Sequence, residues 1–217
     1  MTVRGRWAVA ISVLAAVTAL ALLFWPRRAS VGLRTNLAAL YRDLGRAFGA
    51  GIGPPETLAP VHNAELRAHA SYVQYLSETA REPDGRRRWA TLLAEAAQVR
   101  FAIETLQRHR SLDRFDQCGP TRTALRAGVE EVSGALTATA TRLESPKAPA
   151  VAGADVPAIS RATRDPICTC LAHHAHEGGA DGPLAAGLDA AFVRDLLLEV
   201  AVIADHALET APTVPNG

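Results

Sequence analysis

The sequence contains few aromatic residues and almost no net charge. Aromatic residues make up 5% of its 217 residues, and no stretch alternates apolar and polar residues as a half-buried β-strand does. The 23 basic and 22 acidic residues leave a formal net charge of +1, which provides no basic field for nucleic acid. These absences argue against a β-sheet protein and against nucleic acid as a partner.

Cysteines are also few, and the common enzyme motifs are missing. The three cysteines are Cys118, Cys168 and Cys170, an odd and sparse set that fits a reducing compartment better than a disulfide framework. No Gly-x-Ser-x-Gly, phosphate-loop or dinucleotide-binding pattern occurs. A cysteine beside histidines on one helix provides no oxyanion hole for nucleophilic catalysis. We therefore expect a protein that is not an enzyme.

What the sequence does contain is a long apolar run near its start. Residues 7–25 carry no charge and have arginines on both sides. As a helix with about 1.5 Å of rise per residue, the run covers about 28 Å, close to the ~30 Å hydrocarbon core of a bilayer. A cleavable signal peptide has a shorter apolar stretch and a small-residue cleavage site, whereas this run ends in Trp25-Pro26. The sequence therefore predicts a transmembrane anchor over residues 1–28.

The ends of the run set its expected position and orientation. Trp7 and Trp25 suit the two membrane interfaces, and Arg27 and Arg28 suit the second of them. More arginines follow the run than precede it, so the positive-inside bias places the C-terminal part in the cytoplasm. Those that follow are Arg27, Arg28, Arg34, Arg42 and Arg46, against Arg4 and Arg6 before it. We expect a single-pass protein in contact with the lipid bilayer.

The rest of the chain predicts an all-α fold, an antiparallel bundle of about five or six helices after the membrane helix. Apolar residues recur at steps of three and four over residues 30–48, 56–81, 86–107, 120–143, 158–177 and 184–209. We expect the second and third helices to form a hairpin broken at Glu82-Pro83, and Asp165-Pro166 to interrupt the fifth. The predicted soluble domain covers residues 29–210, followed by a disordered tail over residues 211–217.

Each predicted helix carries an apolar stripe that we expect to face the core. In the second helix the stripe includes Leu66 and Val73, and in the last helix it includes Leu188 and Phe192. In the third helix, Glu95 belongs to the polar face opposite the stripe. Arginines 86–88 stand at the start of that helix, where the positive end of the helix dipole disfavours them.

One cluster has side chains that can bind metal. On a helix, Cys170, His173 or His174, and Glu177 fall on one face, so zinc or copper is the candidate ion. The spacing matches no standard zinc pattern, and the alternative is cysteines packed as small apolar residues beside a histidine-rich helix end. The candidate metal ligands are Cys168, Cys170, His173, His174 and His176.

Two motifs in the first half of the chain point to a family. The first is Trp25-Pro26-Arg27-Arg28-Ala29-Ser30, followed by Leu33-Arg34, Leu37-Ala38 and Leu40, and the second is the stretch from Leu76 to Glu82-Pro83. In these motifs, residues 7–110 resemble the FUSC-like family, the fusaric-acid-resistance and aromatic-acid-exporter group of bacterial membrane proteins. The resemblance implies a membrane block that passes into a helical cytoplasmic region, in the bacterial inner membrane.

The chain departs from this family in its number of membrane helices. Family members carry several, whereas this sequence has one apolar run, and a single uncharged helix cannot line a polar path. The resemblance therefore implies an accessory or truncated component in the efflux of aromatic or small organic acids. A polytopic partner would supply the pore, or copies would self-associate through small residues of the run: Ala8, Ser12, Ala15, Ala16 and Ala19.

Two alternatives from other functional classes stay open. One is a standalone single-pass interaction or sensory protein without a transport role. The other is a metal-responsive module that uses the cysteine and histidine cluster.

Overall fold

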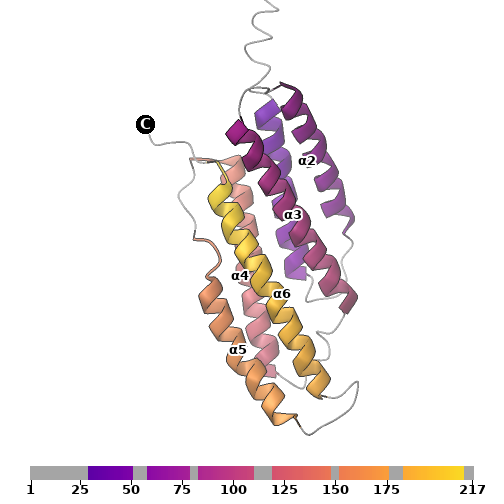
Figure 1. Cartoon of the computed structure of the whole chain (residues 1–217), viewed down its shortest axis with the longest axis vertical. Coiled ribbons are helices and arrows are strands. Elements are labelled where there is room, and N and C mark those ends of the chain that lie inside the picture. The colour runs from indigo at the N-terminus through magenta and orange to yellow at the C-terminus, as the bar shows by residue number, and fades with distance from the viewer. Residues whose placement is uncertain are drawn as a thin grey trace, which may run out of the picture.

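The computed structural model describes residues 29–50, 58–78, 83–109, 119–147, 152–175 and 183–212. These ranges contain α2 (Ala59–Glu78), α3 (Pro83–His109), α4 (Gly119–Glu144), α5 (Val156–His173) and α6 (Pro183–Thr210), and residues 29–50 form a further helix, called helix 29–50 below. No strand occurs within them, so the predicted all-α class is confirmed. Figure 1 shows the helices aligned with the long axis of an elongated bundle.

The predicted anchor over residues 1–28 lies outside the described residues, and Trp7, Trp25, Arg27 and Arg28 lie there with it. Among the helices that the structure describes, none is both long and apolar enough to cross a bilayer. The transmembrane helix and its interface residues therefore stay predictions.

Helix 29–50 is a central part of the hydrophobic core. Its inward side chains recur at steps of three and four, as the sequence predicts, and each is at most 1% exposed: Leu33, Leu37, Leu40, Tyr41, Leu44 and Phe48. The Tyr41 hydroxyl donates a hydrogen bond of 2.9 Å to the carbonyl oxygen of Leu92 on α3. The Asn36 side chain donates to the hydroxyl of Ser71 on α2 over 2.6 Å.

The same helix runs antiparallel to α4, a partner far away in the sequence. Near its start, Arg34 Nε donates to the carbonyl oxygen of Leu143 at 3.0 Å. Near its end, Ser133 donates its hydroxyl to the Gly45 carbonyl at 2.7 Å, and a β-carbon at Gly45 would lie 3.1 Å from the Ser133 carbonyl oxygen. Only glycine allows this close crossing of the two backbones.

Helices α2 and α3 form the predicted antiparallel hairpin. The rings of Tyr75 and Trp89 meet edge to face with centroids 6.4 Å apart, and Glu65 pairs with Arg100 at 2.9 Å. The predicted break over Glu82 to Gly85 extends too far along the chain, because α3 already begins at Pro83. Proline suits a first helical turn, since its φ is preset and no carbonyl there requires its missing N–H.

The predicted inward stripe of α2 is wrong at two positions. Leu66 and Val73 are 56% and 66% exposed. The buried residues are instead Val61, Ala64, Ala68 and Tyr75. Two alanines on this face let α2 approach the core closely, so its larger aliphatic residues point outward.

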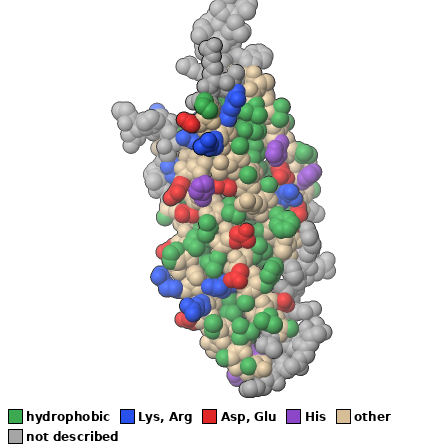
Figure 2. All heavy atoms as spheres, in the orientation of Figure 1, with side chains coloured by type: hydrophobic (Ala, Val, Ile, Leu, Met, Phe, Trp, Pro, Cys, Tyr) green, Lys and Arg blue, Asp and Glu red, His purple; other side chains and the backbone are tan. Residues whose placement is uncertain are grey.

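Helix α6 packs against α3, α4 and α5, and this position changes which of its faces is buried. Leu188 and Phe192, both predicted to be inside, are 59% and 42% exposed. The core residues are Ala190, Val193, Leu197, Val200, Ala201, Ala204 and Ala207. The apolar side of α6 is wide and its buried part is lined mainly by alanine and valine, so the larger Leu188 and Phe192 lie at its edge. In Figure 2, hydrophobic side chains accordingly gather on the outer surface over α3 and α6.

Helix α5 is continuous through Pro166, so the predicted interruption at Asp165-Pro166 is wrong. A proline at this position removes the hydrogen bond to the carbonyl of the residue four earlier, Ala162. Ala162 is exposed, so water can donate a hydrogen bond to its carbonyl oxygen in place of the missing N–H. At the C-terminal end, Ala211 is buried and donates its N–H to Ala207 at 3.0 Å, whereas the rest of the predicted tail from residue 213 lies outside the described residues.

Candidate functional site

Helix α5, which carries the cysteine and histidine cluster, is fixed at its start. The side chain of Asp155 caps the helix by accepting from the Ala158 N–H at 2.9 Å. The Asp155 N–H in turn donates to Glu131 Oε1 on α4 at 2.7 Å. These two bonds set where α5 begins relative to α4.

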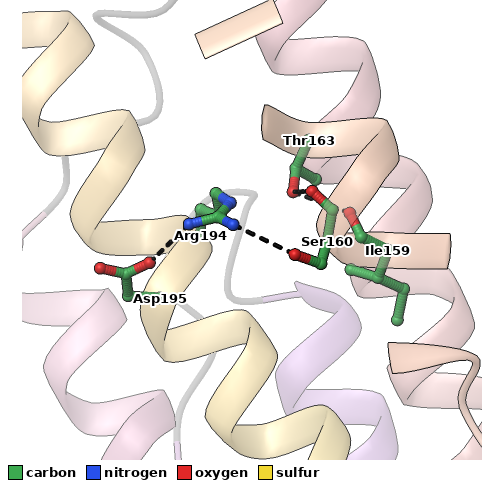
Figure 3. Close-up of polar contacts among 5 residues, drawn as sticks. All are labelled: Ile159, Ser160, Thr163, Arg194 and Asp195. Carbon is green, nitrogen blue, oxygen red and sulfur yellow. Dashed lines mark hydrogen bonds and ion pairs between the residues drawn. The ribbon is translucent and has the colours of Figure 1, made fainter. Parts of the chain in front are cut away.

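The middle of α5 is fixed against α6. Figure 3 shows Arg194 of α6 donating to the hydroxyl of Ser160 at 3.1 Å while it pairs with its neighbour Asp195 at 2.9 Å. One turn further, the Thr163 hydroxyl donates to the Ile159 carbonyl at 2.8 Å and is buried in the same interface. Contacts with α4 and α6 therefore fix the position of α5 ahead of its cysteine and histidine cluster.

A pocket of about 360 Å³ lies between the last turns of α5 and the start of α4. Its α4 wall consists of Pro120 and Thr121. On α5, the lining residues fall on one helical face: Asp165, Pro166, Thr169, Cys170, His173 and His174. The pocket therefore collects the metal-binding side chains of one face of the predicted cluster.

The two cysteines of α5 are in different chemical states. Cys168 is a free, exposed thiol that does not line the pocket. Cys170 is buried and disulfide-bonded. The third cysteine, Cys118, lies outside the described residues. The sparse cysteine set favours a reducing compartment over a disulfide framework, whereas the structure places Cys170 in a disulfide.

The structure describes two of the three histidines of the predicted metal site. His173 and His174 lie next to each other, with ring centroids 4.7 Å apart in an edge-to-face arrangement, whereas His176 lies outside the described residues. In the part of the chain that the structure covers, no group of three or more His, Cys, Asp or Glu side chains is placed to hold a metal ion. The pocket thus brings together Cys170, His173 and His174 and leaves Cys168 on another face.

A second polar site links α3, α6 and helix 29–50. Glu95 is only 8% exposed, and its Oε1 contacts His206 Nδ1 while its Oε2 is buried without a hydrogen-bond partner. Burial raises the pKa of the Glu95 carboxyl despite the bond from His206, and that same bond raises the pKa of His206. Burial first, and the nearby Glu95 charge second, raise the pKa of Tyr41.

The sequence assigned Glu95 to the solvent-facing side of α3, and this prediction is wrong. Helix α6 packs against α3 and brings His206 to Glu95, a contact that the stripe of α3 alone does not reveal. A lone glutamate between apolar residues gives no signal that a histidine more than one hundred residues later will meet it. This pair was therefore missed at the sequence level.

The arginines at the start of α3 have a structural partner. Arg87 and Arg88 line a groove of about 450 Å³ together with Glu209 and Thr210 at the end of α6. The antiparallel packing sets the negative end of the α6 dipole and a carboxylate beside these cations. Their unfavourable position on their own helix is thereby offset by the neighbouring helix.

No family model, no curated protein and no solved structure matches this chain. Its function must therefore be argued from its own residues.

Because of the contact between Glu95 and His206, we expect the free energy of unfolding of the bundle to fall as the pH rises. Both pKa values are raised in the folded state, so the folded chain holds these protons more tightly than the unfolded chain. The stabilisation from His206 is complete below its ordinary pKa of 6.5 and is lost as the pH rises through its raised value. We expect the urea midpoint of the full chain in mild detergent to fall between about pH 6 and 9.

Two histidine variants test this assignment. His206→Gln should flatten the slope of the midpoint against pH, whereas His62→Gln, at an exposed position on α2, should leave the slope unchanged. Equal slopes in the wild type and His206→Gln would show that the pair does not control the pH dependence.

Proposed function

We propose that this chain is a membrane-anchored helical domain of FUSC-like type that acts as an accessory component in the efflux of aromatic or other small organic acids. The observation that supports this most is the burial of helix 29–50. It begins directly after the predicted anchor, yet its apolar side chains belong to the core of the bundle. An anchor attached in this way holds the whole bundle at the membrane rather than on a flexible tether.

The polar contacts of helix 29–50 support the same coupling. Arg34 bonds to the Leu143 carbonyl, and Arg42 pairs with Glu144 at 2.6 Å, so two arginines close to the anchor bind the last turn of α4. Cations are favourable at the negative end of a helix dipole. A tilt of the membrane helix would then be passed to α4, and through α4 to α5 and α6.

The proposal places the bundle in the cytoplasm because of the arginines after the apolar run. The disulfide of Cys170 argues for the opposite side, since disulfides persist mainly in oxidising compartments. Labelling of the exposed Cys168 thiol in intact cells with a membrane-impermeant maleimide decides between the two sides. Labelling without cell disruption would place the bundle outside the cytoplasm.

A flexible insertion tests whether the proposed function depends on rigid coupling. We expect deletion of the gene to make the native host more sensitive to a panel of aromatic carboxylic acids, and the intact chain to restore resistance. Insertion of six Gly and Ser residues between Arg28 and Ala29 should leave the bundle folded and membrane-bound but abolish the restored resistance. The same insertion between Pro149 and Ala150 is the matched control and should retain it.

The outcomes separate this proposal from its alternative. Unchanged sensitivity after deletion would exclude a part in efflux and favour a standalone single-pass interaction protein. Full resistance with the insertion after Arg28 would keep the efflux role but remove the mechanical coupling.

A further inference from the structure

A polar groove of about 450 Å³ lies where α3 begins and α6 ends. In Figure 2, basic, acidic and histidine side chains gather at this end of the bundle. The lining residues of α3 lie on one helical face, because Asp84, Arg87, Arg88 and Thr91 are spaced by three and four residues. On α6 the lining includes His206. The groove therefore brings two arginines and a histidine together from two helices.

The two arginines have donors that the protein does not use. Arg87 and Arg88 are exposed, and neither forms an ion pair or a side-chain hydrogen bond within the ranges that the structure describes. Asp84 and Glu209 line the same groove without pairing with them. A guanidinium presents its N–H donors in a plane that matches a carboxylate or a phosphate. These donors are therefore open to an anion in the groove.

His206 is oriented by Glu95, which lies one turn beyond Thr91 on α3. The ring nitrogen Nδ1 of His206 contacts Oε1 of this buried carboxyl group. The other nitrogen, Nε2, is on the far side of the ring and forms no hydrogen bond with a described residue. A protonated imidazole donates from both nitrogens. With Nδ1 bound to Glu95, His206 thus has Nε2–H left for a ligand in the groove.

The surroundings of His206 favour its protonated form. The hydrogen bond with Glu95 raises the pKa of His206 most, and the negative charges of Glu95, Glu209 and Asp205 raise it further. The charged and titratable groups around the ring are Glu95, Asp84, Arg87 and Arg88 of α3, Asp205 and Glu209 of α6, and, beyond Glu95, Tyr41 of helix 29–50.

The charges of the lining favour a monoanion. With His206 protonated, three cationic side chains face two carboxylates, so a single negative charge on the ligand balances the groove. The positive end of the α3 dipole and the negative end of the α6 dipole meet here and largely cancel. A dianion such as phosphate would leave excess negative charge beside Asp84 and Glu209. The volume lies within the range of about 300–1,000 Å³ that is typical of small-molecule sites.

We propose that this groove binds one small organic monocarboxylate, whose oxygens accept hydrogen bonds from Arg87, Arg88 and His206 Nε2. The inference deepens the proposed efflux role, and the choice of an aromatic acid as the ligand rests on that role. The carboxylate class itself rests on the donors and charges of the groove.

Benzoate binding to the full chain in neutral detergent tests the proposal. Equilibrium dialysis with radiolabelled benzoate at about pH 6, with detergent alone as the blank, should give one site per chain. Unlabelled benzoate should compete at least tenfold better than benzamide, its uncharged analogue, and better than inorganic phosphate by a similar factor. Absence of saturable binding, or equal competition by benzamide, would overturn the carboxylate site. Equal competition by phosphate would overturn the preference for a monoanion.

Two double variants locate the site. Arg87→Gln/Arg88→Gln should weaken benzoate binding at least tenfold. Arg161→Gln/Arg164→Gln removes two exposed arginines from α5 and is the matched control, which should keep the wild-type affinity. Because all four arginines are exposed, both variants should fold, and circular dichroism checks this. An equal loss in both would assign the effect to net charge and overturn the site.

The pH profile tests His206. Benzoate stays ionised between about pH 6 and 9, so any change in its affinity over this range comes from the protein. We expect wild-type affinity to fall at least fivefold as the pH rises through the raised pKa of His206, because Nε2 then loses its proton. His206→Gln should bind more weakly at pH 6 and show a flat profile, whereas His62→Gln should keep the wild-type profile. An unchanged profile in His206→Gln would remove His206 from the site.

Binding and host sensitivity are measured separately, so the two proposals fail in different ways. Benzoate binding at Arg87 and Arg88 together with unchanged sensitivity of the deletion host would keep this site and overturn the efflux role. A sensitive deletion host together with no benzoate binding would keep the efflux role and overturn this site.

Discussion

Replacing Phe48 by alanine is expected to lower the free energy of unfolding by about 3–5 kcal/mol. Phe48 is 0% exposed at the end of helix 29–50, in the same core as residues of α3 and α4. Truncation removes the apolar burial of a whole ring and leaves a cavity that the neighbouring helices fill only in part. A domain stability of about 5–15 kcal/mol makes this one of the largest effects available to a single substitution.

Phe101→Ala is the matched control, because Phe101 on α3 is 59% exposed. Its effect should stay within about 0.5 kcal/mol. Both are measured by urea denaturation of the full chain in mild detergent, followed by circular dichroism. If Phe48→Ala were no more destabilising than Phe101→Ala, helix 29–50 would not unfold together with the bundle, and the rigid coupling proposed above would lose its basis.

The second large effect is expected at Gly128, where α4, α5 and α6 meet. A β-carbon there would lie 2.7 Å from Leu197 Cδ2 and 3.2 Å from Ile159 Cγ2. Leucine adds four carbons to a space that does not hold the first of them. We expect Gly128→Leu to destabilise the bundle by at least about 3 kcal/mol, since the helices must separate to admit the side chain.

Gly134 on the same helix provides the matched comparison. Nothing lies within 4 Å of the position of its β-carbon, and the residue is exposed. Because leucine is the better helix former, Gly134→Leu should raise the stability by roughly 0.5–1 kcal/mol. Equal changes at the two glycines in thermal or urea unfolding would contradict the close packing of α4 on α6.

Periodicity along the sequence predicts the helices well where one helix face meets the core. On α3, the predicted stripe residues Leu92, Val99 and Ile103 are all 0% exposed. Periodicity is a poorer guide where a helix packs against several other helices. The neighbouring helices then determine which of its faces is buried. Phe192 on α6 and Glu95 on α3 are both misplaced for this reason.

In the candidate site, too, the sequence predicts what depends on neighbouring residues and misses what depends on distant ones. Helical spacing predicts that Cys170, His173 and His174 share a face, and the structure places them around one pocket. Cys170 is disulfide-bonded, and spacing within α5 does not encode this covalent state. Local periodicity therefore predicts which residues share a face of α5 but not the covalent state of Cys170.

The antiparallel contact between helix 29–50 and α4 has a consequence for how the chain is made. The first of these helices leaves the ribosome many residues before the second, with Leu33, Leu37 and Leu44 still lacking the surface that later covers them. Contacts between distant parts of a chain form slowly, and exposed apolar surface attracts other chains in the meantime. During translation, the apolar face of helix 29–50 therefore stays uncovered until α4 has been synthesised.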